Sequence, residues 1–254
     1  EDLLLDAITH AETAGKAASA SIKDDDDDVT KQVDAYMAAV TQPISPKDPR
    51  SRSPRAMEAL DKELAALRSR GSTGVWDEST VVELADAKRK NPEGHFARLF
   101  PLVGIKNSEC SDEREWVYKG RIVLGGHEIK TGNGEWAIFG DGGTTPATMT
   151  AARACLAVSV LLQLLVQQTD CLRAYVQAKL EGPPTWVGLP KAWWPKSWHD
   201  KGFVNPVCRL IFALYGHPLA GDYWGKHLST ILKRFGLSSL EGWPGLYFKS
   251  VLVK

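Results

Sequence analysis

Asp170 and Tyr175 are the two residues whose types and spacing most clearly suggest chemistry. Residues 166–171 have β character and precede a segment that we expect to form a short helix, which places Asp170 at the end of a strand. A carboxylate in that position can leave the apolar layer and point into a cleft, where a divalent cation is its natural partner. After a tight turn, Tyr175 would lie beside whatever the metal binds. Both residues also have ordinary explanations, Asp170 as a surface or capping residue and Tyr175 as a core aromatic.

Lys119 and Arg121 form a second pair with chemical potential. They stand two residues apart in a stretch, residues 116–124, that is expected to be a strand. Alternate residues of a strand project from one face, so the two side chains can present two positive charges to a triphosphate. A solvated face of an edge strand accounts for the same pattern.

The elements that must position these residues indicate an α/β (α+β) fold, with a mixed sheet packed on helices. Ser53 and Pro54 mark a helix start, and an apolar stripe continues to Gly71; its members are Met57, Leu60, Leu64 and Leu67. We expect a second helix over residues 79–90, and a helix closed by Gly236. Further strands are predicted at residues 95–100, 185–189, 207–210 and near the C-terminal end. Residues 147–165 are apolar nearly all round, which predicts a helix buried beneath the sheet.

Composition narrows the classes of function. Hydrophobic residues make up 43% of the 254 residues, enough for a core, and the four cysteines are too scattered for a zinc site or a disulfide framework. Residues 115–254 carry 15 Lys and Arg against 9 Asp and Glu, a surplus that suits a phosphate backbone or a plain solvated surface. No dinucleotide fingerprint, phosphate loop or nucleophile elbow occurs. The apolar run 154–166 is short for a membrane span and no signal peptide is visible, so an intracellular location is expected.

Residues 1–53 differ in composition from the rest of the chain. Residues 1–53 contain Asp24–Asp28 and several prolines, which predict an acidic, disordered linker, with the folded domain at residues 54–254. Five adjacent carboxylates repel one another and resist burial. The alternative for this segment is an interaction tail that binds a basic partner or a divalent ion.

An ordered set of motifs resembles the reverse transcriptase of copia-type LTR retrotransposons. The motifs are Lys119-Gly120-Arg121-Ile122-Val123, Asp170-x-x-x-x-Tyr175, Val207-Cys208-Arg209-Leu210 and Leu214-Tyr215-Gly216. The resemblance extends back to about residue 55. Leu219 and Gly221 depart from it, because a Gln and a Pro are frequent there.

The resemblance implies a partial polymerase fingers and palm that carries out RNA-directed DNA polymerisation by two-metal nucleotidyl transfer. Asp170 would be catalytic and a ligand of Mg²⁺, two ions being held in an intact relative. Tyr175 would screen the sugar of the incoming nucleotide, Lys119 and Arg121 would meet its triphosphate, and Gly216 would line the base-pair pocket. The implied partners are an RNA or DNA template with its primer, a dNTP, and other parts of a retroelement polyprotein, with no membrane.

One expected motif is missing. In the family a Tyr-x-Asp-Asp hairpin follows the segment that Gly245–Phe248 resembles, whereas this sequence reaches Lys254 without it. Asp170 alone cannot anchor two metal ions, so we expect little or no polymerase activity from the chain as given. The alternative reading is a non-catalytic retroelement remnant that at most binds nucleic acid through residues 115–254.

Overall fold

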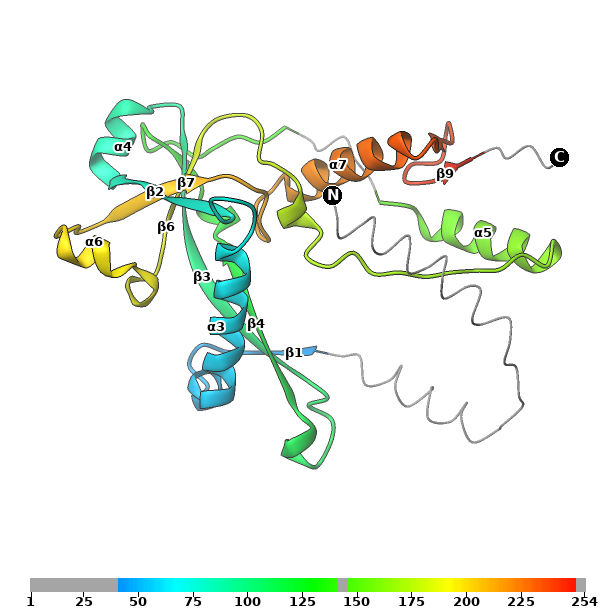
Figure 1. The fold of residues 1–254 in the computed structure, drawn as a ribbon, viewed down its shortest axis with the longest axis horizontal. Coiled ribbons are helices and arrows are strands. Elements are labelled where there is room, and N and C mark those ends of the chain that lie inside the picture. Colours follow the sequence, from blue (N-terminus) through cyan, green and yellow to red (C-terminus); the bar gives the residue numbers. More distant parts are fainter. Residues whose placement is uncertain (1–40, 141–145, 250–254) are drawn as a thin grey trace.

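The computed structural model describes residues 41–140 and 146–249. Figure 1 shows one long twisted sheet with helices on its sides and a separate group of elements around α5 and α7. The helices are α3 (Pro54–Arg68), α4 (Leu84–Lys90), α5 (Met149–Leu161), α6 (Lys196–Asp200) and α7 (Ala220–Arg234). The short 3-10 turns are η1 (Pro49–Arg52), η2 (Glu113–Glu115), η3 (Gly126–Glu128), η4 (Tyr175–Gln177) and η5 (Lys191–Trp193). The strands are β1 (Thr41–Ile44), β2 (Trp76–Glu83), β3 (His95–Lys106), β4 (Val117–Leu124), β5 (Lys130–Thr131), β6 (Thr185–Gly188), β7 (Pro206–Leu210), β8 (Ser238–Ser239) and β9 (Tyr247–Phe248).

The sheet is mixed, which confirms the expected α+β class. Its order is β1-β3-β6-β7-β2, with β4 and β5 also paired to β3. The pairing of β3 with β6 is parallel, and the other pairings in this sheet are antiparallel. β3 is the organising strand, because the long partner β4 follows one half of it while β5 and β6 flank the other half.

Helix α3 packs on the sheet as its apolar stripe predicts. The Ser53 hydroxyl accepts a hydrogen bond from the backbone N–H of Ala56, and Pro54 occupies the first turn. Leu64 and Leu67 join the main core. The backbones of α3 and β4 approach so closely at Gly120 that an added Cβ would lie 2.6 Å from the carbonyl oxygen of Ala59.

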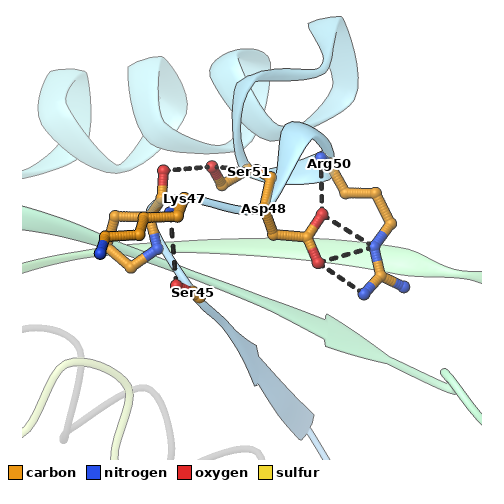
Figure 2. A network of polar contacts seen from close by, with 6 residues as sticks. Ser45, Lys47, Asp48, Arg50 and Ser51 are labelled. Carbon is orange, nitrogen blue, oxygen red and sulfur yellow. Dashed lines mark hydrogen bonds and ion pairs between the residues drawn. The ribbon is translucent and has the colours of Figure 1, made fainter.

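The sheet begins earlier in the chain than the predicted domain start at residue 54. β1 pairs with β3 through four registered residues, from Thr41 opposite Lys106 to Ile44 opposite Val103. Figure 2 shows the turn that follows, where the Asp48 carboxylate accepts from the backbone N–H of Arg50 at 2.9 Å and pairs with its guanidinium at 2.7 Å. Residues 41–53 are therefore ordered by local capping and by a strand, while Asp24–Asp28 lie outside the described residues.

Two predicted helices differ from the structure. The segment expected to be one helix from residue 79 begins as strand β2 and becomes α4 only at Leu84. The β-branched run Thr80-Val81-Val82 explains this, since such residues favour a strand when a partner is available. Strand β7 is that partner: Val82 pairs with Val207, while Thr80 and Val81 lie within a register shift between the two strands. The predicted buried helix at residues 147–165 is present as the shorter α5, but its side chains are largely exposed.

Exposure of α5 is the larger departure. Of its residues only Ala151 is buried, whereas Val160 and Leu161 are 77% and 79% exposed. An apolar sequence predicts that a helix will be buried but does not specify what covers it, and among the described elements none packs extensively on α5. No helix among the described residues is long and apolar enough to cross a bilayer.

Candidate functional site

Three segments that are distant in sequence meet at Tyr215. The guanidinium carbon of Arg121 on β4 lies 5.1 Å from the centroid of the Tyr215 ring. The Tyr215 ring in turn lies 5.0 Å, centroid to centroid, from the ring of Tyr175 on η4. The structure thus brings together two residues that sequence analysis placed in one site, and adds Tyr215 between them. We call Arg121, Tyr175 and Tyr215 the Arg–Tyr cluster.

Arg121 remains able to bind an anion within this cluster. Its side chain is exposed, and in the described ranges it makes no ion pair or hydrogen bond. An aromatic face fixes a guanidinium by a cation–π contact without neutralising it. The planar N–H donors are then free to meet phosphate oxygens, which guanidinium binds in a bidentate manner. Lys119 is exposed on the same face of β4, so the predicted pair of cations does share one side of the strand.

The turn that carries Tyr215 is fixed against the end of β4. The backbone N–H of Leu124 donates to the carbonyl of Tyr215 at 2.8 Å. Gly216 has a φ of +88°, and an added Cβ would lie 2.1 Å from the carbonyl oxygen of Leu124. Glycine is required here because the turn touches the protein's own backbone, which is a structural reason beside the predicted contact with a base pair.

Tyr175 is positioned by contacts of the short turn η4. The side-chain amide of Gln177 donates to the carbonyl of Leu172 at 2.8 Å, and Arg70 Nε donates to the carbonyl of Val176 at 3.1 Å. The ring is half-buried beside the small cluster formed by η4 and α7. The backbone conformation and the neighbouring α7 therefore both hold this tyrosine in place.

Beside Tyr175 lies a pocket of about 740 Å³. Its wall contains aromatic rings and amino groups; they belong to Tyr175, Trp224, Tyr247, Lys226 and Lys233. A volume of this size is in the range of pockets that hold small organic ligands. Apart from Tyr175, sequence analysis placed none of these residues in a site, although Gly221, Trp224, Gly225 and Leu228 recur at helical spacing and mark one face of α7.

Unlike Arg121 on β4 and Tyr175 on η4, Asp170 lies in a segment without regular secondary structure. The strand predicted over residues 166–171 is absent, since this stretch has no regular structure and Asp170 is exposed. The short helical segment predicted after it does form, as η4. The charge of Asp170 adds to burial in raising the pKa of the neighbouring Cys171 thiol.

The described residues do not fit a two-metal centre. Across residues 41–140 and 146–249, no group of three or more His, Cys, Asp or Glu side chains is placed to hold a metal ion. Divalent cations such as Mg²⁺ need several oxygen ligands, and Asp170 supplies one carboxylate. We therefore attribute no metal-dependent step to this arrangement.

His217, the residue after Gly216, is part of the packing rather than of the exposed cluster. It is 5% exposed and its ring meets Phe139 at 5.5 Å between centroids. Its Nδ1 accepts a hydrogen bond from the backbone N–H of Leu219 at 3.1 Å. Burial, together with the nearby His95, lowers the pKa of His217 from 6.5 to about 4.

The sequence is similar to part of a curated retroelement polyprotein. Over 193 residues it is 27% identical to the retrovirus-related Pol polyprotein from transposon TNT 1-94 of Nicotiana tabacum. The match covers 76% of this chain and 13% of that polyprotein, so the chain spans a small part of the relative's length. No protein-family model matches the sequence. No solved structure shows significant similarity to it. The similarity to TNT 1-94 supports a retrotransposon origin.

Proposed function

We propose that this chain is the fingers and part of the palm of a copia-type reverse transcriptase, within a retroelement polyprotein. Its own residues bind the incoming nucleotide beside an RNA or DNA template and its primer. Arg121 and Lys119 contact the triphosphate, Tyr175 screens the sugar, and the turn at Gly216 borders the base pair. The similarity to a Pol polyprotein supports the retroelement context of this proposal.

The observation that carries the proposal is the Arg–Tyr cluster. Arg121, Tyr175 and Tyr215 come from motifs that are 40 to 94 residues apart in sequence, yet their side chains contact one another in a row, with the two tyrosine rings tilted by 59°. This arrangement places an anion-binding guanidinium next to two rings that can pack against a sugar or a base. A nucleotide has a phosphate for the guanidinium and a sugar and a base for the two rings.

Asp170 has a more limited place in the proposal. In an intact relative it would supply one of the several oxygen ligands that Mg²⁺ needs. Because the other described residues do not complete such a site, we expect little or no primer extension by this chain alone. Mg²⁺-dependent extension that disappears in Asp170→Asn would contradict this expectation.

The test is equilibrium binding of a fluorescent primer–template, with and without the complementary dNTP and Mg²⁺. The complementary dNTP should tighten binding in the wild type, and a non-complementary dNTP should not. Arg121→Gln should weaken the dNTP effect by about 10-fold, the value of one charge-assisted hydrogen bond. Arg52→Gln is the matched control, since Arg52 is an exposed arginine on η1, outside the cluster.

The same measurement identifies the alternative function. A non-catalytic remnant would bind primer–template through its basic surface, with a steep salt dependence and no response to dNTP or Mg²⁺. Indifference to the complementary dNTP in the wild type would therefore reject the polymerase assignment and favour the remnant.

A further inference from the structure

The sheet has a second face that the core does not use. Strand register places Ala97, Val187 and Cys208 on one face, where they join the main core with α3. Phe96 and Trp186 alternate with these residues and therefore point to the other face. There they form a small cluster closed by α4, which covers only part of that face (Figure 1).

A pocket of about 210 Å³ opens on this second face, beside α4. Its apolar floor includes Phe96 and Val207, and Gly188 on β6 lines it opposite Arg98. The charged groups around it are three cations and one carboxylate; they belong to Lys88, Arg98, Lys130 and Glu128. The pocket therefore carries a surplus of positive charge.

Two of the three cations, Lys88 and Lys130, lie over aromatic rings. Lys88 Nζ lies 5.7 Å from the centroid of the Phe96 ring, and Lys130 Nζ lies 4.8 Å from that of Trp136. In the part of the chain that the structure describes, neither lysine nor Arg98 has an ion pair. Aromatic faces orient an ammonium group but leave its charge available to a ligand.

We propose that this pocket binds a phosphate group. Two ammonium groups and a guanidinium around a concave, partly apolar floor suit a tetrahedral oxyanion that accepts hydrogen bonds on several sides. The volume lies below the roughly 300 Å³ at which pockets for whole small molecules begin, so it fits the phosphate and its nearest atoms. A phosphodiester of a nucleic-acid strand is the favoured source, and a free phosphate is the other.

The site is separate from the Arg–Tyr cluster and does not depend on the proposed function. None of the residues that line the pocket belongs to that cluster. Binding of a phosphate here requires neither dNTP nor Mg²⁺. A failed dNTP experiment would thus leave this proposal intact, and a failed phosphate experiment would leave the polymerase assignment intact.

The test measures binding of a fluorescein-labelled single-stranded oligonucleotide between about 50 and 200 mM salt. Arg98→Gln should lower the slope of log K against log salt by about 0.7, the loss of one phosphate contact. Gly188→Val should weaken binding without changing charge, because it fills the pocket. A Cβ added at Gly188 would have no neighbour nearer than 3.9 Å, so we expect the fold to tolerate the substitution. Glu128→Gln should tighten binding.

Lys90→Gln is the matched control, since Lys90 is exposed on α4 two residues from Lys88 and does not line the pocket. A second arm titrates inorganic phosphate at constant ionic strength and follows the backbone amide signals of Arg98 and Gly188 by NMR. Effects of Arg98→Gln and Gly188→Val on the oligonucleotide, with none from Lys90→Gln, identify a nucleic-acid phosphate. A saturable response to inorganic phosphate without those effects identifies free phosphate. Equal effects of Arg98→Gln and Lys90→Gln, or no response in either arm, would overturn the proposal.

Discussion

The sheet and the α5 segment contain similar apolar residues in very different surroundings. Leu67 on α3 is 1% exposed, whereas Leu161 on α5 is 79% exposed. The residues proposed to meet the nucleotide follow the same division: Arg121 is on the packed sheet, and Asp170 follows the uncovered helix. The comparison shows that Arg121, which is proposed to bind the nucleotide, is held by contacts of the packed sheet, whereas Asp170 lies in an exposed segment without regular secondary structure.

Gly216→Ala is the substitution that we expect to destabilise the packed region most. Gly216→Ala should lower the free energy of unfolding by about 4 kcal/mol, because strain at positive φ adds to the displacement of the Leu124 carbonyl. Gly134→Ala is the control, since Gly134 has a φ of +90° but no neighbour within 4 Å. It should lose only about 1–2 kcal/mol. Urea denaturation of both variants measures this, and equal losses would show that the close approach is unimportant.

Truncating one leucine in each region tests the comparison itself. Leu67→Ala should lower the free energy of unfolding by about 3–4 kcal/mol, since it leaves a cavity in the main core. Leu161→Ala should change it by less than about 0.5 kcal/mol, because its side chain has little contact to lose. Chemical denaturation of the two variants provides the measurement. A loss above about 2 kcal/mol for Leu161→Ala would mean that α5 is covered in solution.

Protonation of His217 at low pH should lower the stability of the packed region. Because burial lowers the pKa of His217 to about 4, the folded protein keeps this histidine neutral at pH values where the unfolded chain, with a pKa near 6.5, takes up a proton. The free energy of unfolding should fall as the pH drops from 6.5 to about 4, by about 3 kcal/mol in total. Denaturation at a series of pH values measures this slope. His217→Asn should flatten it, and an unchanged slope in that variant would assign the effect to other groups.

Local sequence rules predicted much of the packed region. The Ser53–Pro54 start and apolar stripe of α3, the strands at β4, β6 and β7, and the end of α7 near Gly236 agree with the structure. The strand predicted at residues 95–100 is present as the first half of β3, which continues to Lys106. These elements are determined by short-range signals such as caps, alternation and glycine stops. These predictions agree with the structure because the elements that pack against each predicted helix or strand are among the described residues.

The failures have a common cause. Thr80-Val81-Val82 could join a helix or a strand, and only the position of β7 decides in favour of the strand. The apolar run in α5 predicted burial, which requires a covering element that short-range pattern does not specify. For the site, sequence motifs identified Arg121, Tyr175 and Gly216, but the meeting of Arg121 with Tyr215 depends on how β4 and the turn after β7 pack together.

The most direct test of the central claim is amide hydrogen exchange in the presence of primer–template, complementary dNTP and Mg²⁺. We expect slower exchange in residues 117–124, 175–178 and 213–217, because these segments surround the Arg–Tyr cluster. The effect should be reduced in Arg121→Gln and kept in Arg52→Gln. Unchanged exchange in these segments, or protection confined to residues 162–170, would contradict the assignment of the Arg–Tyr cluster as the nucleotide site.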